Sequence, residues 1–434
     1  MNILLIGSGG REHALCWKLM QSSLLAGDGD TLFASPGNPG MAEEGARCVP
    51  LDTADHGAVV QFCRDNKVEF VVIGPEAPLV DGLADSLRTA NMAVFGPSAD
   101  AAQLEGSKSF TKELCDRASI PTARYIRTSS LEQAWGALKQ FDPPFVLKAD
   151  GLAAGKGVII AETREEAQEA LAEMFDGKFG SAGAEVVIEE YLEGEEVSYF
   201  ALTDGNDIVF LASAQDHKRV GGGDTGPNTG GMGAYSPAPV LTKSLENKVM
   251  DEIIRPTVTT MAAEGRPYSG VLFAGLMLTE KGPQLIEYNA RFGDPECQAI
   301  LSRMTSDLGE LLHACATGSL GKTAPELAQD TVITVVLAAN GYPGTPEKGG
   351  TISGLKDAEN IHTGTKIFHA GTKRGDDGGL VANGGRVLNV TARGADIGAA
   401  RDKAYAAIDA IHFPTGFCRR DIGHRALARE NAAE

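Results

Sequence analysis

Two glycine-rich segments of the chain carry basic side chains at positions where phosphate groups could bind. The first is GSGGREH at residues 7–13, which lies between a short apolar run and a stretch with helical spacing. The N-terminus of a helix presents free backbone N–H groups to an anion, and Arg11 adds a positive charge. A dinucleotide-binding G-x-G-x-x-G motif would need glycine where Glu12 stands, so a nicotinamide site is the weakest interpretation. A phosphate site and a structural tight turn both remain open.

The second segment is KADGLAAGKGV at residues 148–158. It departs from the Walker A pattern, because three residues separate Gly151 from Gly155 and Lys156 is followed by Gly157. Strand-like runs flank it on both sides, which favours a β-hairpin whose tip closes over a nucleotide. Lys148 on the strand and Lys156 at the tip would then neutralise a triphosphate. A solvated hairpin turn is the alternative.

A carboxylate and an amide stand two residues apart in the segment EYNARFGDPE at residues 287–296. In a strand, Glu287 and Asn289 face the same side. Two oxygen ligands suit Mg²⁺, which takes one or two carboxylates together with phosphate oxygens and waters. Arg291 continues this face if the strand persists, and it can hold an anionic substrate or a developing phosphate charge. A polar outer strand face is the alternative.

Two further clusters could contact substrates. The run VIEEYLEGEEV at residues 187–197 places carboxylates after an apolar strand, where they could accept hydrogen bonds from an adenine amino group or from ribose hydroxyls. By itself such a run is more typical of a solvated turn. In QDHKR at residues 215–219, Asp216, Lys218 and Arg219 could orient a small zwitterion. His217 is expected to be a hydrogen-bonding or solvated residue. The glycine-rich stretch 221–233 is predicted to be a mobile loop that supplies N–H groups to an anion.

The elements that position these residues follow from hydrophobic spacing. Through the first hundred residues, apolar runs at 2–6, 32–34, 70–73 and 93–95 alternate with helical spacing at 11–21, 58–66 and 83–90. This alternation predicts an open parallel sheet with helices on both faces. Farther along, residues 270–279 and 284–289 predict a hairpin, and strands near 332–338, 366–370 and 386–391 with a helix near 395–411 predict a C-terminal α+β unit. We expect domains at 1–104, 105–329 and 330–434.

The composition excludes several classes of protein. The 434 residues include 39 Lys and Arg against 58 Asp and Glu, a formal charge of −19 that argues against a nucleic-acid partner. Seven cysteines form no C-x-x-C pair, which is typical of reduced thiols. Neither a signal peptide nor an apolar run of about 20 residues is present, so we expect a cytoplasmic protein without membrane contact.

In this order, the segments resemble the glycinamide ribonucleotide synthetase (phosphoribosylamine–glycine ligase) family, ATP-grasp enzymes of purine synthesis. The resemblance runs nearly end to end. It rests on GSGGREHAL at 7–15, GPEAPLVDGL at 74–83, GPS at 96–98, LEGSKSFTK at 104–112, KADGLAAGKGV at 148–158, EEYLEGEEVS at 189–198, QDHKR at 215–219, GPNTGGMGAYSPAP at 226–239, EYNARFGDPE at 287–296 and NGYPG at 340–344.

The resemblance implies a ligase reaction in two steps. The carboxylate of glycine attacks the γ-phosphate of Mg·ATP to give glycyl phosphate and ADP. The amine of 5-phosphoribosylamine then attacks the acyl phosphate, which gives glycinamide ribonucleotide and phosphate. Water would hydrolyse the acyl phosphate, so residues 148–158 and 221–233 are expected to close over it, and 105–329 would be an ATP-grasp domain with a lid at about 124–195.

The resemblance also implies a role for each candidate residue. ATP is expected to contact Lys108, Lys148, Lys156, Glu189, Glu190, Tyr191, Leu192 and Glu196. Glu287 and Asn289 would hold Mg²⁺, with Mn²⁺ as an alternative. The catalytic residues would be Arg291, Lys148 and Asp216. The substrates are expected to meet Gly9, Gly10, Arg11, Glu12, Pro75, Glu76, Asp216, Lys218 and Asp294.

The expected partners are small molecules, glycine and 5-phosphoribosylamine, and the chain is expected to act as a monomer. Since phosphoribosylamine is labile, a transient contact with the upstream amidophosphoribosyltransferase is a further hypothesis. Three rival functions remain at this stage. They are another ATP-grasp enzyme such as a bicarbonate-dependent carboxylase, a nicotinamide dehydrogenase, and a nucleotide-binding module without turnover.

Overall fold

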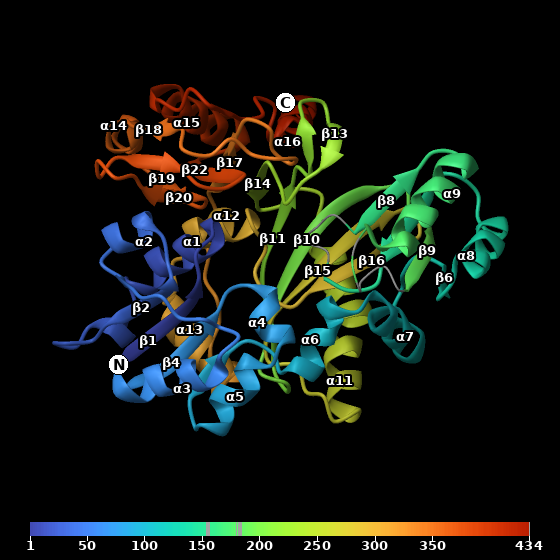
Figure 1. The fold of residues 1–434 in the computed structure, drawn as a ribbon, viewed down its shortest axis with the longest axis horizontal. Coiled ribbons are helices and arrows are strands. Elements are labelled where there is room, and N and C mark those ends of the chain that lie inside the picture. Colours follow the sequence, from blue (N-terminus) through green and yellow to red (C-terminus); the bar gives the residue numbers. More distant parts are fainter. Residues whose placement is uncertain (153–156, 179, 181–184, 434) are drawn as a thin grey trace.

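The computed structural model describes residues 1–152, 157–178, 180 and 185–433. Lys156, the expected cation of the hairpin tip, lies outside these residues. In Figure 1 the N-terminal and C-terminal parts of the chain (blue and red) lie on one side, and a smaller sheet with its helices projects on the opposite side. No helix in the described ranges combines the length and apolar character needed to cross a membrane.

The N-terminal part confirms the expected parallel sheet. Its strands run in the order β3-β2-β1-β4-β5, with bounds β1 (Asn2–Gly7), β2 (Leu32–Pro36), β3 (Arg47–Cys48), β4 (Val68–Ile73) and β5 (Ala93–Phe95). Successive side chains of a strand point to opposite faces. Ile3 and Leu5 accordingly pack on the side of α1 (Gly10–Leu19), whereas Leu4 and Ile6 pack on the side of α3 (His56–Asp65). Helices therefore cover both faces, as predicted.

Short helices complete this part and lead into the next. Their bounds are α2 (Pro39–Glu43), α4 (Glu76–Val80), α5 (Leu83–Thr89), α6 (Ala99–Gly106) and α7 (Lys108–Ala118). Ser107 caps α7, because its hydroxyl accepts a hydrogen bond from the backbone N–H of Phe110 at 3.0 Å. The cap fixes the start of α7 and places Lys108 on its first turn.

A sheet of antiparallel strands forms the centre of the molecule. The nine-stranded sheet runs β16-β15-β10-β11-β14-β17-β22-β19, and β23 pairs with β17. Its strands are β10 (Glu195–Thr203), β11 (Ile208–Asp216), β14 (Gly233–Ser236), β15 (Gly270–Thr279), β16 (Gly282–Asn289), β17 (Thr331–Ala339), β19 (Thr365–His369), β22 (Arg386–Gly394) and β23 (Gly416–Phe417). The expected hairpin of β15 and β16 is confirmed. Strand β14 pairs with both β11 and β17, so one sheet continues from the central region into the C-terminal region.

Helices pack on this sheet in both the central region and the C-terminal region. They are α10 (Lys243–Val249), α11 (Arg255–Ala263), α12 (Glu296–Arg303), α13 (Leu308–Ala316), α14 (Leu355–Ile361), α15 (Ile397–Ala410) and α16 (His424–Ala433). A three-stranded sheet of β18 (Thr351–Ile352), β21 (Leu380–Ala382) and β20 (Thr372–Arg374) borders the C-terminal region. The C-terminal α+β expectation is therefore confirmed.

The projecting unit of Figure 1 is a separate four-stranded antiparallel sheet in the order β6-β9-β7-β8. Its strands are β6 (Tyr125–Thr128), β7 (Phe145–Ala149), β8 (Val158–Ala161) and β9 (Val186–Glu190), and its helices are α8 (Leu131–Ala137) and α9 (Arg164–Glu173). Its core consists of its own side chains, among them Phe145, Leu147, Leu171 and Ile188. A unit with its own core can move as one body about the segments that join it to the rest.

The glycine-rich stretch after β11 differs from its expected loop. Residues 219–228 form a hairpin of β12 (Arg219–Gly221) and β13 (Thr225–Asn228). Asp224 stands in the turn with a φ of 55°. Its carboxylate lies 3.0 Å from Nη1 of Arg419 and 2.5 Å from Nη2 of Arg425. These ion pairs attach the turn to the C-terminal region, which is why the segment has a defined structure despite its composition.

Candidate active site

A cavity of about 720 Å³ brings most of the predicted site residues together. Elements of the N-terminal part, of the projecting sheet and of the central sheet all contribute to its walls. The predicted residues that line it are Arg11, Glu76, Lys108, Lys148, Glu189, Glu190, Tyr191, Leu192, Glu196, Asp216, Lys218, Glu287, Asn289, Arg291 and Asp294. Among the described candidates, those that do not line it are Gly9, Gly10, Glu12 and Pro75.

Glu287 and Asn289 lie on the last part of β16, and both side chains line the cavity, as their spacing predicts. Burial opposes ionisation of Glu287, but the nearby Lys218, Lys108 and Lys148 lower the pKa of its carboxyl. The described residues contain no group of three or more His, Cys, Asp or Glu side chains that could hold a metal by themselves. One ionised carboxylate and one amide oxygen fit Mg²⁺ that completes its coordination with phosphate oxygens and waters.

A buried cluster of opposite charges surrounds Lys148. The two oxygens of the Glu189 carboxylate lie 3.0 Å from Nζ of Lys148 and 3.1 Å from Nζ of Lys112. Lys148 also donates a hydrogen bond to the backbone oxygen of Ile286 on β16, at 3.0 Å. In this structure Glu189 therefore orients two lysines on the cavity wall.

Sequence reasoning missed Lys112 as a site residue. Lys112 donates to Oγ1 of Thr122 at 2.7 Å and to the backbone oxygen of Ala123 at 3.2 Å, where the chain enters the projecting sheet. Burial lowers the pKa of Lys112, and Glu189 opposes this shift. The available signal was its position one helical turn after Lys108, which places both lysines on one face of α7.

Lys112→Met is expected to lower the free energy of unfolding by about 3 kcal/mol, because Glu189 loses one of its two buried cationic partners. It is also expected to raise the KM for ATP, since Lys148 and the chain at Thr122 lose their orientation. Urea unfolding and an ATP titration of turnover measure the two effects. The exposed Lys139→Met is the matched control. If both variants behave like the unmodified protein, the cluster does not position the nucleotide.

Arg291 is held in the cavity by two carboxylates of the N-terminal part. Its Nε lies 3.2 Å from Oε2 of Glu76 and its Nη2 lies 3.0 Å from Oε1 of Glu105. Burial raises the pKa of Glu105, and Arg291 opposes this shift. Strand β16 ends at Asn289. The ion pairs, and not a continued strand face, therefore determine where the guanidinium points.

Asp216 ends β11, and Lys218 follows it on the cavity wall. Lys218 pairs with Glu196 of β10, the carboxylate that was expected near the ribose. Burial raises the pKa of Asp216, and Lys218 opposes this shift. Acidic and basic side chains therefore lie side by side on this part of the cavity wall, an arrangement that suits a small zwitterion.

Of the two expectations for His217, the structure supports a hydrogen-bonding residue and not a solvated one, because the side chain is buried. Its Nε2 accepts a hydrogen bond from the backbone N–H of Gly423 at 3.2 Å. Burial lowers the pKa of His217 to about 4, so the imidazole is neutral at pH 7.

The turn before α1 lies behind the cavity wall. The Glu12 carboxylate accepts a hydrogen bond from the backbone N–H of Gly9 at 2.7 Å and pairs with Arg11. Arg11 also donates to the backbone oxygen of Phe292 at 3.1 Å. A Cβ added to Gly10 would lie 2.2 Å from Nδ2 of Asn389, so the start of α1 packs closely against β22. Arg11 is therefore the group of this turn that reaches the cavity.

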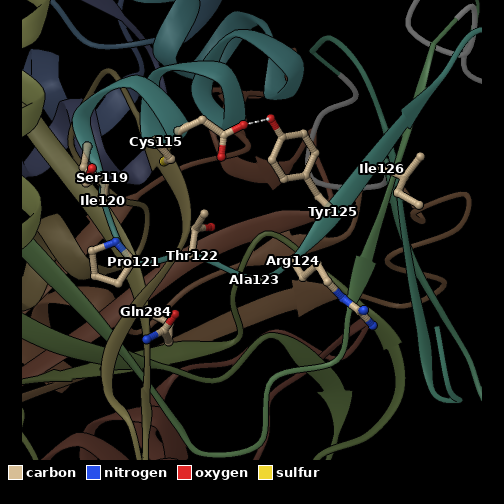
Figure 2. Close-up of a pocket in the computed structure, with 11 residues that line it drawn as sticks. Cys115, Ser119, Ile120, Pro121, Thr122, Ala123, Arg124, Tyr125, Ile126 and Gln284 are labelled. Carbon is tan, nitrogen blue, oxygen red and sulfur yellow. Dashed lines mark hydrogen bonds between the residues drawn. The ribbon is translucent and has the colours of Figure 1, made fainter. Parts of the chain in front are cut away.

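A second pocket of about 710 Å³ lies outside this site, where the chain passes from α7 to β6 (Figure 2). The hydroxyl of Tyr125 donates a hydrogen bond to Oδ2 of Asp116 at 2.6 Å across it. None of the predicted site residues within the described part of the chain lines this pocket.

Comparisons with known proteins agree with this architecture. Residues 106–297 match the family model described as phosphoribosylglycinamide synthetase, ATP-grasp (A) domain, residues 1–105 match its N domain, and residues 332–425 match its C domain. The crystal structure of phosphoribosylamine–glycine ligase from Thermotoga maritima is similar with a TM-score of 0.82 and 34% identity, over 97% of this chain and 100% of that one.

Of two further similar proteins, one shares only the fold of this chain and the other is also closely similar in sequence. The biotin carboxylase domain of the Hydrogenobacter thermophilus 2-oxoglutarate carboxylase has a TM-score of 0.72 at 17% identity, over 96% of this chain and 91% of that one, a likeness of fold alone. The phosphoribosylamine–glycine ligase of Mesorhizobium japonicum is 57% identical over 433 residues, which cover 100% of both chains.

The fold, the charged cavity and the family match therefore define an enzyme of the ATP-grasp class, whose members use ATP and a divalent metal. Within it, the chain belongs to the phosphoribosylglycinamide synthetase family, and it is an ATP-dependent ligase.

Proposed function

We propose that the chain ligates glycine to 5-phosphoribosylamine at the expense of ATP, with glycyl phosphate as the intermediate and with glycinamide ribonucleotide, ADP and phosphate as products. The proposal rests on one observation, namely that a single cavity holds the lysines for a triphosphate, the Glu287–Asn289 pair and the cationic Arg11. The full-length similarity to phosphoribosylamine–glycine ligases supports it. The reaction belongs to purine biosynthesis.

In the first step, Lys108 and Lys148 hold the phosphates of ATP, with Lys156 as a third cation, and Glu189, Glu190, Tyr191, Leu192 and Glu196 border the nucleoside. Glu287 and Asn289 hold Mg²⁺ or Mn²⁺. When bound, this metal neutralises charge on the transferred phosphoryl group. Arg291 adds a guanidinium where negative charge develops, and a carboxylate oxygen of glycine forms the new bond to phosphorus as the bond to ADP breaks.

In the second step, the amine of phosphoribosylamine attacks the carbonyl carbon of glycyl phosphate. The bond from this carbon to the phosphate oxygen breaks, phosphate leaves, and the nitrogen releases one proton. Asp216 and Lys218 orient glycine. Arg11 meets the ribose phosphate, with Gly9, Gly10, Glu12 and Pro75 in the wall behind it, and Glu76 and Asp294 lie beside the sugar. Closure of the lid, residues of about 124–195, excludes water from the acyl phosphate.

The test is phosphate release by the purified protein with freshly made phosphoribosylamine. Turnover is expected only when ATP, glycine and phosphoribosylamine are all present. Equal release without glycine would contradict the proposal, and dependence on bicarbonate would indicate a carboxylase. NADH binding without ATP binding would indicate a dehydrogenase, and ATP binding without turnover would indicate a nucleotide-sensing module.

We also propose the cell compartment, the oligomeric state and one partner protein. Seven cysteines are free in the structure, which is typical of a reducing compartment and supports a cytoplasmic location. We propose a monomer, which light scattering tests, and a transient contact with the amidophosphoribosyltransferase that makes the labile amine. In an assay that couples the two enzymes, the product yield is then expected to be unaffected by a large excess of an inert trap for the amine. Complete loss to the trap would contradict the hand-over.

A further inference from the structure

The C-terminal region reaches the cavity through Arg386, the first residue of β22. Nη1 of Arg386 donates hydrogen bonds to the backbone oxygens of Gly230 and Asp294, both at 2.6 Å, and lies 3.4 Å from the backbone oxygen of Gly231. Its Nη2 lies 3.1 Å from Oδ2 of Asp294. One guanidinium therefore joins two separate loops, each of which lines the cavity.

The first of these loops carries the Asp294 carboxylate. Oδ1 of Asp294 accepts a hydrogen bond from Nε2 of Gln298 at 2.8 Å, and Arg386 holds Oδ2. Burial opposes ionisation, but Arg386 and Arg11 lower the pKa of Asp294. A Cβ added to Gly9 would lie 3.5 Å from Oδ2, so this carboxylate stands next to the turn that precedes Arg11. Arg386 and Gln298 thus fix both oxygens of an ionised carboxylate at the Arg11 end of the cavity.

The second loop is the end of the glycine-rich stretch. Gly231 has a φ of 109°, and a Cβ added to it would lie 2.5 Å from Cδ of Pro295. The Gly230–Gly231 backbone therefore packs directly on the Asp294 loop, and Arg386 bridges the two. Without the guanidinium, its carbonyl acceptors would lose a charged donor, which costs more than a neutral hydrogen bond.

We propose that Arg386 is a positioning residue for the phosphorylated ribosylamine substrate. It acts through Asp294, whose remaining lone pairs accept hydrogen bonds from ribose hydroxyls or from the amine, and through the Gly230–Gly231 backbone. The inference rests on the proposed function and deepens it, because it gives the C-terminal region a part in binding the second substrate. The guanidinium of Arg386 bonds to Gly230, Gly231 and Asp294 rather than to the lysines and the carboxylate of the ATP end, so binding of ATP is expected to be unaffected.

The experiment compares Arg386→Met and Arg386→Lys with the unmodified protein in steady-state assays that vary each substrate in turn. Arg386→Met is expected to raise the KM for phosphoribosylamine at least 20-fold while the KM for ATP and kcat change less than threefold. Arg386→Lys keeps the positive charge but not the planar guanidinium. Its KM for phosphoribosylamine is therefore expected to lie between those of the unmodified protein and Arg386→Met. Calorimetric titration with the product glycinamide ribonucleotide, which is not labile, is expected to show a matching loss of affinity.

Arg420→Met is the matched control, because Arg420 lies in the same region, is 57% exposed and pairs with Asp409. An equal rise in the KM of all three substrates, or a fall in kcat alone, would overturn the proposal and leave Arg386 a structural residue. If Arg386→Met does not fold, Arg386→Lys decides by the same criteria. Absence of phosphoribosylamine-dependent turnover in the unmodified protein would instead refute the proposed function.

Discussion

Glu287→Gln is expected to lower kcat for ATP turnover by about 1,000-fold and to leave the protein folded. The glutamine keeps the shape of the side chain but removes the charge that would hold the metal, and a loss of about 4 kcal/mol of transition-state stabilisation corresponds to this factor. The lowered pKa of Glu287 means that the carboxylate is ionised at pH 7 in the unmodified protein. Phosphate release at saturating ATP, repeated over a range of Mg²⁺ and Mn²⁺ concentrations, measures the effect.

Glu280→Gln supplies the control for this prediction, because Glu280 is exposed at the turn of the same β15–β16 hairpin. Its activity and its metal dependence are expected to be unchanged. Thermal unfolding of both variants reports on the fold. If Glu287→Gln unfolds, or if it keeps full activity at low Mg²⁺, Glu287 is a structural carboxylate and the metal lies elsewhere.

Arg291→Met is expected to lower kcat by about 1,000- to 10,000-fold, within the range of arginines that stabilise charge on a transferring phosphoryl group. Glu76 and Glu105 hold this guanidinium by ion pairs at 3.2 Å and 3.0 Å, so its position is fixed before the reactants bind. Pre-positioned charge in a cavity from which water is excluded acts strongly on a transition state. Single-turnover phosphate release measures the step directly.

Removal of Arg291 also leaves the carboxylates of Glu76 and Glu105 without their cation. The resulting loss of stability would lower activity without any catalytic role of Arg291. The double variant Arg291→Met/Glu105→Gln removes the more buried of the two charges, and it is expected to recover stability but not activity. Recovery of activity in the double variant would show that Arg291 serves only to neutralise Glu105. Arg291→Lys is expected to lose less than Arg291→Met, because the charge remains but the planar fork does not.

Patterns of short range were predictable from the sequence. Alternating runs of apolar residues predicted the parallel strands β1, β2, β4 and β5, because the period of a strand or helix is a property of neighbouring residues. The two-residue edge strand β3 (Arg47–Cys48) was not predicted. The spacing of Glu287 and Asn289 predicted their common face for the same reason. The β12–β13 hairpin was missed, since glycine, proline and asparagine have low strand propensity. Asp224 in its turn is held by Arg419 and Arg425, which lie 195 and 201 residues later.

The sequence by itself determined most of the elements, the order of the motifs and the chemical types that line the site. Only the tertiary structure decided which charges meet: Lys112 and Lys148 at Glu189, Arg291 at Glu76 and Glu105, and Arg386 at Asp294. Each basic side chain had 58 acidic residues as possible partners. An ion pair depends on distance in space and on burial, and neither is encoded by the spacing of neighbouring residues.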